Sequence, residues 1–454
     1  MWLAQFCALF AAAAASVLIT AALAFCTARR SPRGFYAVFA AVVVCCAFAS
    51  SLCLARLVQD EPFPDSAKFT ARVLLVRPWG RSAALLLETP YGRAAAYVPQ
   101  KEAPRAGAEV FVRAASFEFK KAERPGGFDE RFYWRARNAS RRLVVFEMKE
   151  TGAPRGLAAW RARVERAFAE KLPPLSSAYM AALTTGARDD DIQELHKKAG
   201  TSHLLAISGF HVALLAGALF WLFGKNLRGA IAVSAAIWLY VAAAGAPAGG
   251  LRAALMTELC LAAFLAGRPR SAFNGVSCAA LFLLLWNPWY FFDLGFRLSV
   301  LAALFISAAA SVVPQNWKGA AAVAVLVWFV TAPLTASAFG LIPMAGLVLN
   351  IVAVPWFSLL FPLVALLSLP ALAGLPFARL AAAASEALLL FSHKALSAGS
   401  SLVPWAAGPS SALTAAALVI FICAVCARCR VKMETAPILC AIFLFILLYC
   451  PSML

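Results

Sequence analysis

The stretch LIPMAGLVLNIVAVPWFSLLFPLVALLSLPAL, residues 341–372, contains no Lys, Arg, Asp or Glu. About 20 apolar residues are enough for a helix to cross a hydrocarbon layer ~30 Å thick. Comparable apolar runs recur along the chain, in which 62% of the residues are hydrophobic and 14% are charged. A soluble domain has roughly 45–50% apolar and about 25% charged residues. The sequence therefore predicts a polytopic α-helical membrane protein.

The apolar runs divide the chain into two membrane parts, with two helices in residues 1–56 and a multi-span domain over residues 201–454. About 12 spans are expected in all. Four prolines within residues 341–372 predict that this run is broken or re-entrant. The expected spans are residues 2–26, 35–55, 203–223, 229–246, 251–266, 271–287, 294–313, 319–338, 341–372, 379–400, 411–427 and 436–452.

Basic residues gather at every second turn between these runs. Lys and Arg are enriched in cytoplasmic loops, so these turns are expected on the cytoplasmic side of the membrane. Residues 57–200 and both termini are then expected on the extracytoplasmic side. The basic turns contain Arg29/Arg30/Arg33, Lys225/Arg228, Arg268/Arg270, Lys318, Arg379 and Arg428/Arg430/Lys432.

Residues 57–150 have a different pattern, in which short alternating runs are separated by Gly and Pro. This pattern predicts an extracytoplasmic OB-like barrel of about five strands. Residues 151–200 predict a helical connector that begins with an amphipathic helix over residues 155–171 and continues over residues 176–198. The expected strands are residues 68–76, 83–88, 94–98, 110–114 and 143–147.

The formal net charge of +19 has two interpretations. Residues 60–200 hold 25 basic and 18 acidic residues, a net +7, which leaves +12 (16 − 4) for the membrane parts. The membrane share follows in part from topology. The rest is compatible with a polyanionic ligand drawn by a positive field.

Several polar residues fall within predicted spans, where such groups usually face protein or a watery cavity. The first span after the outer domain, residues 203–223, contains His203, Ser208, Gly209 and His211. The two histidines would lie roughly 80° apart on one helix. They either line a pathway or satisfy neighbouring backbone while Ser208 and Gly209 allow close packing.

Other polar residues in the spans give further pathway candidates. Arg252 and Glu258 lie on different faces of one span, so each is expected to find a partner on another helix. Arg297 either lines a polar cavity or extends to the outer interface. Ser299 and Asn350 are uncharged candidates, for which helix packing is the alternative role.

Catalytic motifs are sparse. The sequence has no P-loop, and its four histidines cannot supply a dense metallohydrolase cluster. No metal, no cofactor and no enzymatic activity is therefore expected. One catalytic alternative stays open, an intramembrane serine hydrolase that uses Ser208 with His203 or His211.

Residues 199–212, AGTSHLLAISGFHV, resemble the signature of the ComEC family of competence channel proteins. Residues 125–134, PGGFDERFYW, resemble a motif near the end of that family's OB-like domain. The resemblance extends over nearly the whole chain. Further matching pieces, in the family's order, are Arg252–Met256, Gly267-Arg268, Asn287-Pro288, Asp293–Ser299, Ala332-Pro333, Asn350 and Pro355.

This resemblance implies transport of single-stranded DNA across the bacterial inner membrane during natural transformation. It implies as partners an extracytoplasmic DNA receptor and a cytoplasmic ATPase or helicase. The sequence ends without the metallo-β-lactamase-like domain of many members, so a separate nuclease is expected to degrade the other strand. Arg297 stands where the family pattern suggests Gln. A transporter or flippase of another polyanion is the alternative function.

In the outer domain, aromatic residues interleaved with arginines suggest a surface that binds single-stranded DNA. The alternative is that the aromatic side chains fill the small barrel. The DNA-binding candidates are Arg124, Arg131, Tyr133, Trp134 and Arg135.

Overall fold

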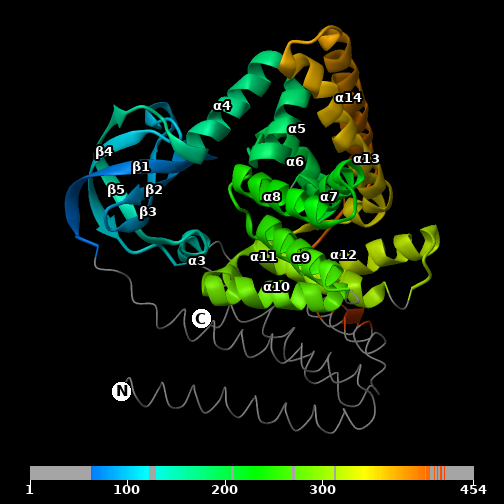
Figure 1. The fold of residues 1–454 in the computed structure, drawn as a ribbon. Helices are drawn as coiled ribbons and strands as arrows, with labels where there is room; N and C mark the ends of the chain where they lie inside the picture. The colour runs from blue at the N-terminus through cyan, green and yellow to red at the C-terminus, as the bar shows by residue number, and fades with distance from the viewer. Residues whose placement is uncertain are drawn as a thin grey trace, which may run out of the picture.

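A five-stranded barrel and a larger helical body are joined by the long helix α4 (Figure 1). The predicted spans 2–26, 35–55 and 436–452 lie outside the described residues, as does most of the predicted span 411–427. The computed structural model describes residues 63–121, 129–205, 209–267, 271–310, 313–403 and 405–408, with single positions at 414, 417, 420, 421 and 424.

The barrel is closed, in the strand order β1-β2-β3-β5-β4, with β4 pairing back onto β1. Strands β3 and β5 run parallel, and the other neighbours are antiparallel. Alternate residues such as Val73, Leu85 and Val112 point inward and are fully buried, as a period of two requires. The predicted five-stranded barrel is confirmed. Its strands are β1 (Ser66–Trp79), β2 (Ser82–Thr89), β3 (Gly92–Pro99), β4 (Glu109–Phe117) and β5 (Ala139–Gly152).

Four helices connect the barrel to the helical body, three of them along the chain after β5 and one, which lies between β4 and β5, by packing alone. The predicted helix over residues 176–198 is two helices, because Gly186 ends α5 with φ at +70°. A Cβ at Gly186 would lie 3.2 Å from the Ala244 carbonyl oxygen, so the turn also packs against the body. The linking helices are α3 (Glu130–Arg135), α4 (Gly156–Lys171), α5 (Pro174–Thr185) and α6 (Asp190–Lys198).

The helical body contains long apolar helices. Among the described residues, α9, α12 and α13 are long and apolar enough to cross a membrane, and α7, α8, α10 and α11 are shorter apolar helices. The chain is therefore a membrane protein, although these helices do not reach the 12 expected spans. The helices are α7 (Gly209–Phe223), α8 (Leu227–Ala243), α9 (Ala248–Leu265), α10 (Ala272–Trp286), α11 (Leu294–Ala309), α12 (Trp317–Phe339), α13 (Ala345–Ala373) and α14 (Ala378–Leu402).

The proline-rich run is not broken within the helix. Helix α13 continues through Pro355, Pro362 and Pro370 for 29 residues. Proline removes one backbone donor, and neighbouring helices and local adjustments tolerate this loss inside membranes. Only the start of the run leaves the helix, where the two-residue strand β6 (Ile342–Pro343) pairs with β7 (Ala406–Ala407).

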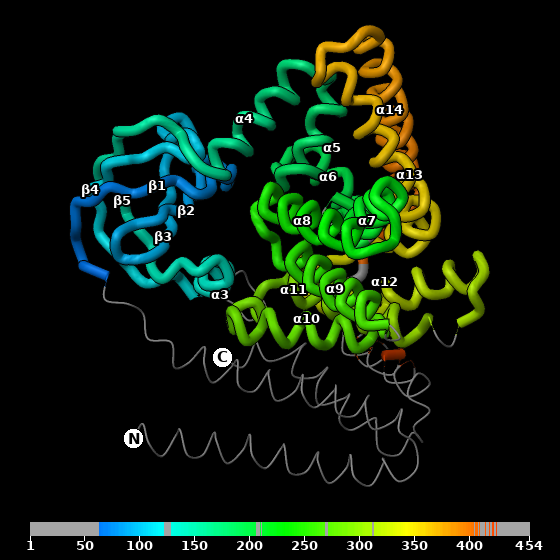
Figure 2. The backbone as a smooth tube through the Cα atoms, in the orientation of Figure 1, coloured from blue at the N-terminus to red at the C-terminus, as the bar shows by residue number. Residues whose placement is uncertain are grey.

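The end of the connector packs on the turn between α13 and α14. Lys171 Nζ donates to the Leu372 carbonyl oxygen at 2.8 Å, and Glu386 of α14 accepts from two amides at the start of α5 at 3.0 and 2.8 Å. Figure 2 shows α4 and α5 meeting this hairpin. The sequence pattern placed the Arg379 turn and residues 151–200 on opposite sides of the membrane. These contacts place them together, so the predicted alternation is wrong at this turn.

Candidate functional site

A cavity of about 2990 Å³ opens between the barrel and the helical body and extends among α9, α11, α12 and α13. Its described lining includes nine basic and four acidic side chains, so the cavity has a positive field. The basic residues are Arg77, Lys121, Arg131, Arg137, Arg188, Lys197, Lys198, Arg252 and Arg297, and the acidic residues are Asp129, Asp189, Glu194 and Asp293.

The acidic side chains of the cavity already have partners within the protein. Asp129, Asp189 and Asp293 cap α3, α6 and α11, because each accepts a hydrogen bond from a backbone amide in the first turn. Glu194 forms an ion pair with Lys198 at 2.6 Å. These contacts leave the positive side chains in excess toward the open space.

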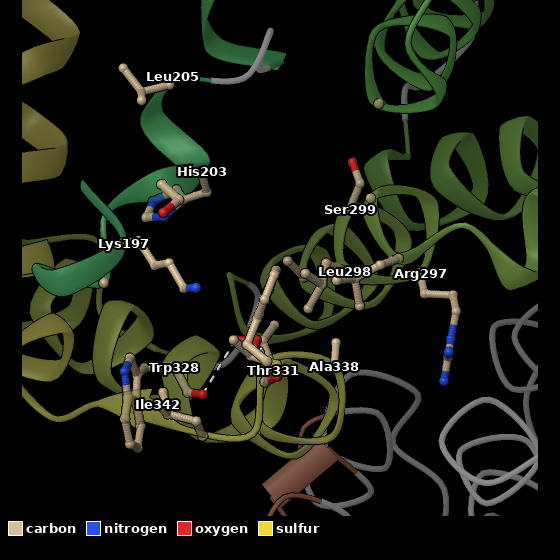
Figure 3. A pocket seen from close by; sticks show the side chains of 18 of the residues that line it. Lys197, His203, Leu205, Arg297, Leu298, Ser299, Trp328, Thr331, Ala338 and Ile342 are labelled. Carbon is tan, nitrogen blue, oxygen red and sulfur yellow. Dashed lines mark hydrogen bonds between the residues drawn. The ribbon is translucent and has the colours of Figure 1, made fainter. Parts of the chain in front are cut away.

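One wall of the cavity depends on the contact between Gly200 and Gly346. Gly200 adopts φ of +69°, and a Cβ there would lie 2.8 Å from the Gly346 Cα. Asn350 Nδ2 donates to the Gly200 carbonyl oxygen at 3.4 Å. The contact holds the next turn, η2 (Ser202–Leu204), at the cavity, and Figure 3 shows His203 across the open space from Ser299.

A buried histidine supports this wall from behind. His196 Nε2 lies 2.9 Å from the Tyr179 hydroxyl, and Nδ1 lies 2.8 Å from Thr201 Oγ1. Both ring nitrogens of His196 therefore have a hydrogen-bond partner within the protein, one as donor and the other as acceptor according to the tautomer. Burial lowers the pKa of His196 to about 4, which keeps this ring neutral.

Helices α9 and α11 bring two predicted pathway residues together. Arg252 Nε donates to Ser299 Oγ at 2.8 Å, and Arg252 Nη1 lies 3.1 Å from Met256 Sδ. The expectation that Arg252 has a partner on another helix is confirmed. The expectation also holds for Glu258, which accepts from Ser234 Oγ at 2.7 Å, but Glu258 lies in a separate groove beside α8.

The remaining membrane candidates are dispersed. Gly209 lines the cavity, whereas the His211 ring packs 5.9 Å from the Phe361 ring. His203 and His211 belong to η2 and α7, so the predicted placement of both on one helix is wrong. Ser208 lies outside the described residues.

Arg297 reaches the cavity from a largely apolar environment. Its side chain is 7% exposed, and its guanidinium carbon lies 5.9 Å from the centroid of the Phe291 ring. The neighbouring cluster contains Phe296, Val300 and Leu301 of the same helix. This burial argues against extension of Arg297 to the outer interface, and Figure 3 shows its side chain directed away from His203 and Lys197.

Helix α3 serves mainly as a brace between the barrel and the helical body. Phe132 stacks on Phe292 with ring centroids 4.0 Å apart, and the Arg135 guanidinium lies 5.0 Å from the Trp289 ring. Trp134 is 1% exposed, and its indole N–H donates to the Tyr97 hydroxyl at 2.8 Å. The Trp134 ring therefore has no free face for a base.

The other outer-domain candidates differ from Trp134. Arg131 and Tyr133 line the cavity, and Arg124 lies outside the described residues. Two further arginines at this end of the cavity, Arg77 and Arg188, were missed by sequence reasoning. No local pattern marks them, since one is on β1 and the other follows α5.

Comparisons with known proteins place the chain in a family. A profile of the family described as Competence protein matches residues 183–435. ComE operon protein 3 of Bacillus subtilis is 36% identical over 152 residues, which are 32% of this chain and 20% of that protein. No solved structure matches the chain. Because the family match covers more than half of the 454 residues, the chain belongs to the competence proteins of the ComEC family.

Proposed function

We propose that this protein transports single-stranded DNA across the bacterial inner membrane during natural transformation. The observation that carries the proposal is the cavity of about 2990 Å³, which joins the barrel to the membrane helices and has nine basic against four acidic side chains. A polyanion needs a wide polar path that attracts phosphates without holding any of them tightly. Membership of the competence family favours DNA over another polyanion.

The protein acts as a channel rather than as an enzyme under this proposal. The polar groups that meet in the cavity, such as Arg252 and Ser299, contact each other as a donor and an acceptor rather than as a nucleophile and a base. The chain has no P-loop, so a cytoplasmic ATPase or helicase would pull the strand. A DNA receptor outside would deliver it, and a separate nuclease would degrade its complement.

We also propose that the barrel lies on the extracytoplasmic side, within a total of about 12 spans. The barrel end of the body contains the turn between α8 and α9, where a Cβ at Gly245 would meet Arg161 of α4. It also contains η3 (Pro288–Phe292), which packs on α3. The basic turns with Lys225 and Lys318 join the opposite ends of these helices, as the positive-inside rule requires of cytoplasmic turns.

The test follows labelled duplex DNA in a transformable strain from which the gene has been deleted. The deletion strain should bind DNA outside the cell but hold none in the cytoplasm that resists added nuclease. The intact gene should restore import. Normal import in the deletion strain would refute the channel and leave transport of another polyanion as the alternative.

Two variants of the same helix make the test specific for the cavity. Arg252→Gln changes a charged group that lines the cavity, and Glu258→Gln changes one in the separate groove. The variant would lose a charged hydrogen bond from Arg252 to a phosphate of the passing strand. Such a bond contributes about 1.5–3 kcal/mol, which corresponds to a fall in import on the order of tenfold or more. Glu258→Gln should import DNA at close to the normal rate. Equal import by the two variants would show that the strand does not pass Arg252.

A further inference from the structure

Three arginines from separate segments converge on Tyr133 at the barrel end of the cavity. Arg77, on β1, donates from Nη1 to the Tyr133 hydroxyl at 3.3 Å. Arg137, which follows α3, lies 3.7 Å from the centroid of the Tyr133 ring. Arg188, in the turn between α5 and α6, is close enough for its charge to act on the other three residues.

The described residues neutralise this cluster only in part. Asp293 Oδ2 lies 3.8 Å from Arg137 Nη1, and the field of Asp190 acts on Arg188. Within the described part of the chain, Arg77 and Arg188 form no ion pair. Like charges that are held together are unfavourable unless an anion lies among them.

The positive field has a direct effect on Tyr133. Burial by itself would raise the pKa of the Tyr133 hydroxyl, but the charges of Arg137, Arg77 and Arg188 outweigh burial and hold this pKa below its ordinary value. A hydroxyl in such a field is a good hydrogen-bond donor to an anion. The guanidinium groups of Arg77 and Arg188 and the Tyr133 hydroxyl therefore all favour an anionic ligand.

The geometry favours a phosphate over a base. The Arg137 guanidinium covers one face of the Tyr133 ring, and Trp79 and Trp134 pack around it with ring centroids 5.6 and 5.1 Å away. A base would therefore find no open ring on which to stack. Guanidinium groups present planar pairs of donors that match phosphate oxygens.

We propose that Arg77, Arg188 and the Tyr133 hydroxyl form a subsite that binds one backbone phosphate of the entering strand at the barrel end of the cavity. This inference rests on the proposed function. The subsite contacts no base, so it holds strands of all sequences alike. It lies between α3 and the turn between α5 and α6, at the barrel end of the cavity, and so it presents the strand to the membrane part of the cavity.

The test measures binding of a labelled single-stranded oligonucleotide to the full-length protein in nanodiscs of neutral lipid. The apparent Kd is determined over a series of salt concentrations for the wild type and for the double variant Arg77→Gln/Arg188→Gln. The matched control is Arg166→Gln, which removes an exposed charge of α4 that does not line the cavity. An abasic oligonucleotide and added anionic lipid provide two further arms.

The double variant should lower the slope of log K against log salt by about 0.7, the value for one phosphate contact on a single strand. The abasic strand should show the same decrease, and Arg166→Gln should keep the wild-type slope. Equal slopes for the double variant and the control would overturn the subsite while leaving the channel intact. Competition by anionic lipid that the double variant abolishes would assign the arginines to a lipid headgroup instead. A wild type that binds no DNA would refute the channel itself.

Thermal stability separates a binding role from a structural one. Removing neighbouring like charges should leave the apparent Tm without DNA unchanged or higher, and it should remove part of the increase in Tm that DNA causes in the wild type. Tyr133→Phe keeps the ring and removes only the hydroxyl, so it should weaken DNA binding without lowering the Tm. A lower Tm without DNA for the double variant would mean that the arginines brace the fold, and this would overturn the subsite.

Discussion

Replacing Gly200 with alanine should disrupt the wall that holds His203 at the cavity. The new Cβ would lie 2.8 Å from the Cα and 3.2 Å from the amide nitrogen of Gly346. Two penalties add, because φ is +69° and the space is occupied. The left-handed conformation costs roughly 1–2 kcal/mol for a residue with a Cβ, and overpacking against backbone costs about 1–3 kcal/mol. The free energy of unfolding should therefore fall by about 2–5 kcal/mol.

A matched control isolates the steric part of this penalty. Gly374, which ends α13, has φ of +68°, and no atom lies within 4 Å of a Cβ built there. Gly374→Ala therefore carries the conformational cost alone. Tryptophan fluorescence of the purified protein in detergent gives the apparent Tm of each variant. The apparent Tm should be highest for the wild type, lower for Gly374→Ala and lowest for Gly200→Ala. Equal Tm values for the two variants would refute the close approach of Gly200 and Gly346.

Other predictions concern the hydrogen bonds and the pH dependence of the helical body. Glu386→Ala leaves the Leu175 and Ser176 amides without their side-chain acceptor, so the unfolding free energy should fall by about 1–3 kcal/mol, and Glu386→Gln should lose less. The pKa of His196 falls from 6.5 to about 4 on folding, so the unfolded chain binds the proton first. Stability should therefore decrease by about 3 kcal/mol as the pH falls from 6.5 to 4, and His196→Gln should remove this part of the dependence in pH-resolved unfolding. Arg252→Gln and Ser299→Ala should show a coupling energy of about 0.5–3 kcal/mol in a double-mutant cycle.

Each of these predictions has an outcome that contradicts it. Equal losses for the alanine and glutamine variants of Glu386 would argue against its role as an acceptor. A pH profile of His196→Gln that matches the wild type would place the titration elsewhere. Additive effects of Arg252→Gln and Ser299→Ala would mean that their hydrogen bond contributes nothing to stability.

Much of the architecture could be predicted because it depends on local pattern. Period-two alternation with Gly and Pro between the runs marks five strands, since each strand must bury one face and leave the other outside. Long apolar runs mark helices because a backbone in lipid must satisfy its hydrogen bonds internally. The resemblance over residues 199–212 identified the family correctly.

The functional interpretation of single residues was less predictable. Tryptophan is a residue on which nucleic-acid bases often stack, so the sequence made Trp134 a candidate. Its burial in the barrel follows only from packing against Tyr97. Arg252 and Glu258 have similar placement in the sequence, but one lines the cavity and the other lies in a separate groove. Hydrophobic pattern reports whether a residue is in a helix, and it does not report which neighbour a helix face meets.

The sequence by itself determined the class of this protein, its barrel, its apolar helices and its family. These properties follow from composition, periodicity and a long local signature. Tertiary structure alone decided the cavity and the cluster of Arg77, Arg137 and Arg188 around Tyr133. It also decided that the connector meets the α13–α14 turn, contrary to the alternation of basic residues. The physical reason is that these contacts join segments far apart in the chain, and local pattern carries no information about which distant side chains share one space.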